Sequence, residues 1–214
     1  FLMEKDTKSY VMLFYNLTLR VRFCRLKEVF MYTLFIDTHY ISLHLALFKD
    51  ELVIEEIKKE DVKHSTYFIP LLKELLEKND VTFDDLSGII VVNGPGSFTG
   101  VRIGVVVAKM ISYCKNIPVK AISYLQALSL KYDNDLLIGI KDRNGAFVGS
   151  FNRDHDLVLD YFYLSNKELE SYPKKIKLDE EINLDMVYKY LKNKEDIDPH
   201  LLKPIYVKKI EVGK

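Results

Sequence analysis

The chain has 214 residues, of which 48% are hydrophobic and 29% charged, a composition typical of a folded globular protein and not of a disordered one. Its 31 Lys and Arg balance its 31 Asp and Glu, so no basic excess favours direct binding of RNA or DNA. The two cysteines, Cys24 and Cys114, are too few for a disulfide framework and do not have the spacing of metal ligands. The sequence contains no apolar run of about 18 residues, the length that would predict a membrane span. We therefore expect a cytoplasmic protein.

The first part of the chain, residues 1–30, does not read as the start of a domain. The chain begins with Phe1, and an apolar stretch over 10–19 is flanked by basic residues. Met31 then opens the first regular strand pattern. We interpret residues 1–30 as a non-native or mis-started extension. A secretory signal and an additional amphipathic element packed on the domain are the alternatives.

From Met31 onward, the pattern predicts a three-stranded meander followed by alternating helices and strands. The predicted strands are 32–37, 41–48, 51–57, 88–92 and 119–123. The predicted helices are 65–78, 100–115 and 124–131, with Ser65 or Thr66 as the first cap and Pro70 near the first turn. A meander that continues into parallel βαβ units implies a mixed sheet covered by helices.

A second lobe is predicted after Asp133. Its strands are expected at 136–140, 146–151 and 157–164, with a turn over 142–145, and its helices at 166–172 and 185–192. We therefore divide the chain into lobe 1, residues 31–133, and a shortened lobe 2 with a C-terminal tail, residues 134–214.

The stretch 88–104 reads GIIVVNGPGSFTGVRIG, a buried strand that leads into a glycine-rich turn and a helix. A Walker A loop needs GxxxxGK[ST], and the segment 94–100 supplies neither the lysine nor the hydroxyl after it. The glycine spacing is GxGxxxG, one residue longer than the GxGxxG fingerprint of dinucleotide-binding proteins. Ser97 or Thr99 can cap the following helix, whose free N–H groups can meet an anion. These observations are compatible both with a tight structural turn and with a ligand-binding loop.

Other short motifs accompany this turn. GPGSFTGVRIG is followed by Ala108-Lys109, by Ile117-Pro118-Val119 and by SYLQA over 123–127, and it is preceded by Ile36-Asp37-Thr38 and by His64-Ser65 with Leu71-Leu72. Together they resemble the TsaB (YeaZ) family, whose pattern is IDTS, an HS..LLP helix, GPGSFTGLRIG, an AK pair, iPv and SsLeAL. The similarity covers Met31 to about Phe151, with a further C-terminal match at 203–206.

The resemblance implies an α/β fold of the ASKHA class, with a mixed sheet flanked by helices and two ribonuclease H-like lobes, as in actin and Hsp70. It also implies a role in forming N6-threonylcarbamoyladenosine (t6A) beside the tRNA anticodon. In that pathway TsaC makes threonylcarbamoyl-AMP, TsaD transfers the group to tRNA, and TsaE is an ATPase. A TsaB-type chain is then a partner of TsaD, with TsaE in the larger complex and tRNA contacted only indirectly.

No catalytic or metal site is predicted. The ATP site of this fold needs further glycine turns, and the glycines beyond Gly104 are scattered. We expect His39, His44 and His64 at the surface or in turns, and Asp37 as a turn cap. The family's Ser after Asp-Thr is His39 here, which weakens a phosphate contact. We expect no cofactor, and leave open weak ATP and Mg²⁺ binding in a complex at vestigial contacts: Asp37, Thr38, Gly94, Gly96, Ser97, Thr99 and Gly100.

The helix after the glycine turn is apolar nearly all round, since only Arg102, Lys109, Ser112 and Lys115 break its hydrophobic run. A helix of this kind must be buried on two sides, and we expect the second side to face another chain. The family uses its equivalent pair of helices in this way. The predicted interface comprises Phe68, Ile69, Leu72, Leu75, Leu76, Val101, Val105, Val106, Ala108, Lys109 and Ser112. The alternative is that lobe 2 covers these helices.

The sequence thus predicts a TsaB-type subunit without activity of its own, paired with TsaD or forming a homodimer when alone. One alternative is a small ASKHA ATPase or kinase that uses Asp37 and the loop 94–100. A peptidase, a label once attached to this superfamily, would need an HExxH motif, a nucleophile with its base or a metal cluster, and none is present. A homodimer that serves as a storage or regulatory form is a third alternative.

Overall fold

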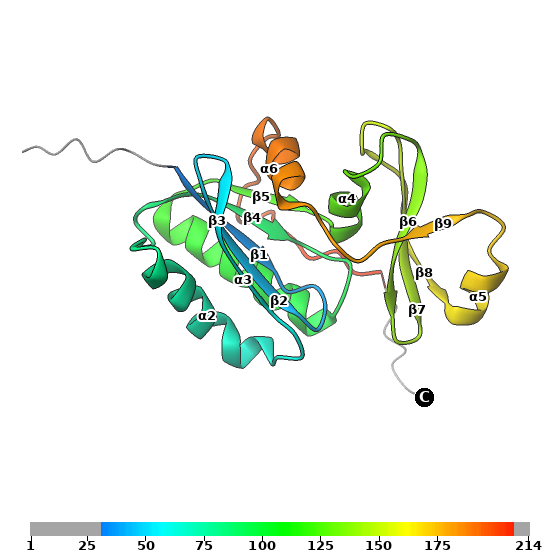
Figure 1. Ribbon diagram of the computed structural model, residues 1–214, viewed down its shortest axis with the longest axis horizontal. Helices are drawn as coiled ribbons and strands as arrows, with labels where there is room; N and C mark the ends of the chain where they lie inside the picture. The colour runs from blue at the N-terminus through cyan, green and yellow to red at the C-terminus, as the bar shows by residue number, and fades with distance from the viewer. Residues whose placement is uncertain (1–30, 208–214) are drawn as a thin grey trace, which may run out of the picture. The chain divides into compact units, whose positions relative to one another are not determined.

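The computed structural model describes residues 31–207 (Figure 1). The interpretation of residues 1–30 as an extension lies outside the described residues. The described strands form two sheets, ordered β3-β2-β1-β4-β5 and β8-β7-β6-β9. The first contains β1 (Tyr32–Asp37), β2 (Leu43–Lys49), β3 (Leu52–Lys59), β4 (Leu86–Val92) and β5 (Val119–Ile122). The second contains β6 (Leu136–Asp142), β7 (Gly145–Phe151), β8 (Leu157–Ser165) and β9 (Ile176–Leu178).

Both sheets are mixed, and the mixed character of the first was predicted. In the first, β2 pairs antiparallel with β1 and β3, whereas β4 pairs parallel with β1 and β5. In the second, β7 pairs antiparallel with β6 and β8, and β9 pairs parallel with β6. Strand β9 was not predicted, because its three residues alternate Ile, Lys and Leu without enough length to show a period.

The five described helices flank the sheets. They are α2 (His64–Lys78), α3 (Phe98–Lys115), α4 (Tyr124–Ser129), α5 (Asn166–Ser171) and α6 (Leu184–Lys192). Helices α2 and α3 cover one face of the first sheet, and α4 and α6 lie on its other side (Figure 1). The predicted α/β architecture, with a mixed sheet flanked by helices and a second group of strands after it, is confirmed.

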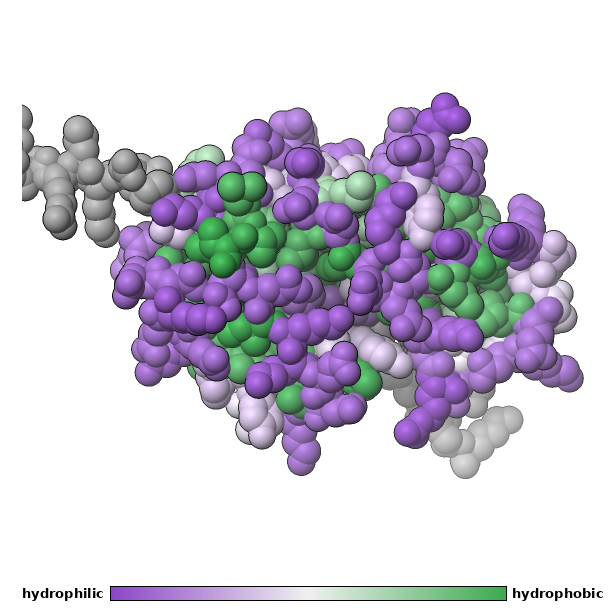
Figure 2. Space-filling model, in the orientation of Figure 1, coloured by the Kyte–Doolittle hydropathy of each residue, from purple (hydrophilic) through white to green (hydrophobic). Residues whose placement is uncertain are grey.

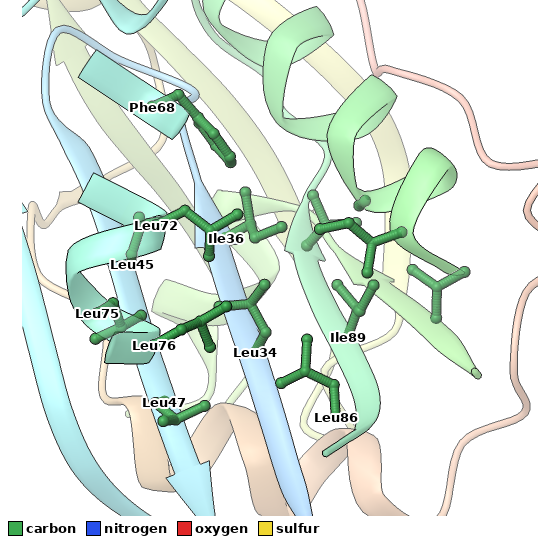
Figure 3. Close-up of a cluster of buried hydrophobic side chains, with 14 of the residues drawn as sticks. Leu34, Ile36, Leu45, Leu47, Phe68, Leu72, Leu75, Leu76, Leu86 and Ile89 are labelled. Atoms are coloured by element: carbon green, nitrogen blue, oxygen red, sulfur yellow. The ribbon is translucent and has the colours of Figure 1, made fainter. Parts of the chain in front are cut away.

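The central strand β1 is buried on both faces, and its alternate residues belong to two different cores. Leu34 and Ile36 pack with α2 and α3, as Figure 3 shows, whereas Phe35 packs with α4, α6, β6 and β7. Because successive strand residues point to opposite faces, one continuous apolar run serves both cores. The end of β1 is therefore held rigidly, and it carries Asp37.

Helix α2 begins earlier than predicted. Its N-cap is Lys63, which makes no side-chain capping bond, so Ser65 and Thr66 lie inside the helix. Pro70 also lies in the interior and not in the first turn. The helix accommodates Pro70 on its exposed side, where the carbonyl left without an N–H donor by the proline ring can be solvated.

Helix α3 has the predicted cap, since the Ser97 side chain accepts a hydrogen bond from the Gly100 N–H. It ends at Asn116, which is in the left-handed conformation and donates its backbone N–H to the Ser112 carbonyl. Among the described residues, neither α3 nor any other helix is long and apolar enough to cross a membrane.

The end of the described chain returns from the second sheet to the first. Ile197 forms a bridge with Val119, Leu202 is buried in the core under α2 and α3, and the Ile205 N–H donates to the Asn93 carbonyl at 2.7 Å. The tail therefore packs against the first sheet and its helices, although the predicted lobe boundaries place it in lobe 2.

Candidate functional site

The glycine-rich turn packs directly under the residues that follow β1. A Cβ atom at Gly96 would collide with the His39 carbonyl, one at Gly100 with the Thr38 carbonyl, and one at Gly104 with the Thr38 hydroxyl. Glycine is needed at Gly96 and Gly100 because the backbone of another segment lies against them, and at Gly104 because the Thr38 side chain does. The turn thus joins the end of β1 to the start of α3 without space between the two segments.

Hydrogen bonds fix the same junction. The Ser97 N–H donates to the His39 carbonyl at 2.6 Å, and the Thr38 hydroxyl donates to the Gly100 carbonyl at 2.7 Å. The Gly100 N–H is used by the Ser97 cap. The Ser97 and Gly100 N–H groups, two of the donors at this helix start, are therefore already engaged within the chain.

Of the predicted vestigial phosphate contacts, the structure brings Asp37, Thr38, Gly96, Ser97 and Gly100 into this junction. Two others lie differently. Thr99 is exposed on the first turn of α3, and Gly94, at a φ of 112°, packs against Ile205 of the tail. Anion binding by these residues stays a prediction.

Asp37 forms a buried pair with His39. One carboxylate oxygen accepts both the His39 ring Nδ1 at 2.7 Å and the His39 backbone N–H at 2.9 Å, the second bond being the predicted turn cap. Burial alone would raise the pKa of Asp37, but the charge and hydrogen bonds of His39 outweigh it and lower that pKa. Asp37 is therefore ionised at neutral pH and acts only as an acceptor.

His44 approaches the same carboxylate from the neighbouring strand, since it is the Cα partner of Asp37 in the β1–β2 ladder. Its Nε2 lies 2.8 Å from the Glu56 carboxylate. Burial lowers the pKa of His44 despite the attraction of Asp37 and Glu56. The expectation that these histidines lie at the surface or in turns was wrong for His44, which is in β2 and 8% exposed. His39 does lie in the bend after β1, but it is only 4% exposed. Their pairing with carboxylates, the buried Asp37 and the exposed Glu56, compensates for the loss of water.

A cavity of about 720 Å³ opens above this pair, between the end of β1, the meander, α4, the β6–β7 hairpin and the segment 180–182. Tyr124 of α4 stacks on the His39 ring with centroids 3.7 Å apart, and its hydroxyl donates to the Glu180 carbonyl. Burial, reinforced by nearby carboxylates, raises the pKa of Tyr124, so its hydroxyl stays neutral. Groups of three or more metal-ligating side chains are absent from the described part of the chain.

Most of the predicted interface side chains lie in the chain's own core and cannot contact a partner in this structure. Their exposed fractions are 6% or less because they pack on the first sheet: Phe68, Leu72, Leu75, Leu76, Val101, Val105, Ala108 and Ser112. The other three members, Ile69, Val106 and Lys109, are at least partly exposed. The interface prediction therefore has to be corrected for the eight buried residues.

The outer side of α3 carries its own row of exposed apolar residues. Val106, Met110 and Tyr113 are 59%, 52% and 67% exposed, and their spacing of four and three residues places them on one helical face. Ile69 of the adjacent α2 is 57% exposed. We call Ile69, Val106, Met110 and Tyr113 the α3 face. Met110 and Tyr113 were not predicted, although their spacing from Val106 is a signal in the sequence.

The tail borders the α3 face without covering it. The Arg102 side chain lies over the Phe98 ring, at 3.9 Å from its centroid, and donates to the Tyr206 hydroxyl. Lys109 reaches the His200 carbonyl at 3.4 Å. Other hydrophobic patches on the molecule are separated by hydrophilic groups on the side that Figure 2 shows. What distinguishes the α3 face is its regular helical spacing.

Part of the chain is similar to known proteins that are named TsaD or TsaB. The family model "TsaD: tRNA N6-adenosine threonylcarbamoyltransferase" matches residues 55–141. The Bacillus subtilis "tRNA threonylcarbamoyladenosine biosynthesis protein TsaB" is 42% identical over 98 residues, 44% of this chain and 42% of that protein. The protein of the same name from Buchnera aphidicola subsp. Acyrthosiphon pisum is 24% identical over 186 residues, 74% of this chain and 82% of that protein.

The chain is thus similar to proteins of the TsaB (YeaZ) family. A solved structure titled "YeaZ from Pseudomonas aeruginosa" has the same fold, with a TM-score of 0.67 and 19% identity over 83% of this chain and all of that one. The match with the Bacillus relative spans less than half of that protein's length. The resemblance stated from the glycine-rich motif is thus confirmed.

Proposed function

We propose that this TsaB-like chain is a subunit without catalytic activity of its own that supports t6A formation in tRNA by pairing with a TsaD-type protein. The names of its relatives place them in threonylcarbamoyladenosine biosynthesis. The engaged donors of the glycine turn support a non-catalytic role. Contact with tRNA is then indirect, a TsaE-type ATPase joins the larger complex, and the site of action is the cytoplasm.

The observation that carries the pairing is the α3 face. Its side chains are large and apolar, they are more than half exposed, and they belong to two helices that cover the same face of the first sheet. An exposed apolar face of this kind is typical of a protein–protein interface. Pairing with two helices of a partner would form a four-helix contact around Val106.

The test is co-expression with a TsaD homologue followed by size-exclusion chromatography and a titration of the two purified proteins. Val106→Glu should raise the Kd more than about 100-fold, because it buries an unpaired charge at a cost of about 3 kcal/mol. Ile69→Glu should act in the same direction. The matched control is Val158→Glu, since Val158 on β8 is 58% exposed and lies outside the α3 face.

Equal affinity of Val106→Glu, Ile69→Glu and the unaltered chain for TsaD would show that another surface pairs. A chain that stays monomeric and ignores TsaD would contradict the proposed function itself. When TsaD is absent, we propose that the same face joins two copies of this chain. The homodimer should then dissociate as TsaD is added.

A second candidate function is a small ASKHA ATPase or kinase. The observation in its favour is that ionised Asp37 lies at the end of β1, beside the glycine turn, and lines a cavity of about 720 Å³. Calorimetry with ATP and Mg²⁺ separates the two candidates. Micromolar binding by the isolated chain would support the enzyme, whereas binding only in the presence of TsaD would fit the subunit.

A further inference from the structure

Two cationic side chains lie along one margin of the α3 face. Arg102 is four residues before Val106 and Lys109 three residues after it, so both belong to the side of α3 that carries the apolar row. The Arg102 side chain donates to the Tyr206 hydroxyl of the tail at 2.7 Å. The Lys109 ammonium group reaches the His200 carbonyl, also in the tail, at 3.4 Å. We call Arg102 and Lys109 the basic edge, which therefore lies between the apolar row and the tail.

The chain itself does not neutralise the basic edge. Ion pairs among the described residues include neither Arg102 nor Lys109, whose bonds to the tail end on an uncharged hydroxyl and an uncharged carbonyl. Helix α3 contains no carboxylate, and its remaining cation, Lys115, is paired with Asp84 at 2.6 Å. Helix α2 adds no net charge, because its two lysines are matched by two glutamates. The two helices therefore present an uncompensated positive charge beside the exposed apolar side chains.

The spacing of the basic edge specifies the geometry of a complementary partner. Arg102 and Lys109 are seven residues apart on one helix, which corresponds to about two turns or roughly 10 Å along its axis. A second helix that packs at a small angle along α3 returns to the same side after the same seven residues. Two carboxylates with this spacing, beside an apolar stripe, would therefore meet both cations at once. Charges that flank an apolar seam in this way select the partner of a helix.

Two other occupants fit this surface less well. An RNA backbone could neutralise Arg102 and Lys109, but it would leave the side chains of the α3 face, all more than half exposed, without an apolar partner. A second copy of this chain would cover those side chains. In a two-fold pair, however, the same surface faces itself, so the two basic edges would repel each other. The homodimer is therefore the weaker of the two pairs.

We propose that the basic edge selects the partner, because Arg102 and Lys109 pair with two carboxylates a heptad apart on an apolar-faced helix of the TsaD-type protein. This inference rests on the proposed function and adds to it the chemistry of the partner surface. The apolar side chains of the α3 face supply the contact area. The two ion pairs at its margin favour the acidic partner over a second copy of this chain.

The experiment is a titration of the full chain with its TsaD homologue at about 50 mM and about 500 mM NaCl. The Kd should rise several-fold with salt, because screening weakens the two ion pairs. The double variant Arg102→Gln/Lys109→Gln should raise the Kd at low salt about tenfold and remove most of the salt dependence. The same variant should form its homodimer at least as tightly as the unaltered chain, since a repulsion is removed.

Lys115→Gln is the matched control, since Lys115 lies on the same helix, is exposed and pairs with Asp84 within the chain. It should bind TsaD as the unaltered chain does. A carbodiimide cross-link, which joins an amine directly to a carboxylate, gives a second readout. It should connect Lys109 to a carboxylate of TsaD, and peptide mass spectrometry should find no such product with Lys109→Gln.

The inference is overturned if the double variant pairs with TsaD as tightly as the unaltered chain, or if its homodimer weakens as much as its pair with TsaD. Loss of tRNA binding by the variant, with TsaD pairing unchanged, would assign the basic edge to RNA and would also overturn it. Failure of the unaltered chain to pair with TsaD at either salt concentration has a different meaning. It would contradict the proposed function itself, and this inference with it.

Discussion

At the scale of single residues, the close contacts of the glycine turn leave no room for a side chain. Gly96 has no room for a Cβ beside the His39 carbonyl, so Gly96→Ala should destabilise the chain by about 2 kcal/mol or more, because a backbone group must move. The control is Gly88→Ala in β4, where the nearest atom would lie 3.7 Å away and where alanine suits a strand better than glycine. Thermal unfolding should show a fall of several degrees for Gly96→Ala only. Equal melting temperatures for the two variants would contradict the close packing.

His44 gives the stability of the chain a pH dependence. Its folded pKa lies below the unfolded value of about 6.5, so the unfolded chain binds more protons between the two values. The free energy of unfolding should therefore fall as the pH drops from 7 to 5. Asp37 does not contribute in this window, because its lowered pKa makes its stabilisation constant above about pH 4.

Urea titrations at several pH values check this dependence. His44→Gln should flatten the decline between pH 7 and 5, and the exposed His200→Gln should keep the profile of the unaltered chain. A His44→Gln variant that loses stability with the same slope would show that other groups take up the protons.

At the scale of elements, helix α3 has one side buried in the core of the chain and another side exposed to solvent. Val105 is 2% and the next residue, Val106, 59% exposed. Val105→Ala should lower the free energy of unfolding by about 2 kcal/mol, since it removes buried methyl groups and leaves a cavity. Val106→Ala should change it by less than about 0.5 kcal/mol. Urea denaturation of the monomer measures both, and equal losses would mean that both sides of α3 are buried.

Most helices and strands could be predicted from the sequence because their hydrophobic patterns extend over many residues. The same patterns could not distinguish core residues from interface residues on α2 and α3. Phe68 and Val106 are both apolar residues at helical spacing, and only the placement of the sheet makes the first a core residue and the second an exposed one. The approach of His44 to Asp37 was not predicted either. Residues on neighbouring strands meet through register, which one strand's pattern does not contain.

At the scale of the whole molecule, the last described residues complete the first core. Leu202 is 2% exposed and packs in the cluster under α2 and α3, whereas Leu201 beside it is 67% exposed. Leu202→Ala should therefore cost about 2–4 kcal/mol, and Leu201→Ala less than about 0.5 kcal/mol. Because Ile197 and Ile205 attach the same segment to β5 and to Asn93, the loss should appear as one cooperative transition with an unchanged urea dependence. A separate early transition in Leu202→Ala would show instead that the tail unfolds independently and that the first core is stable without it.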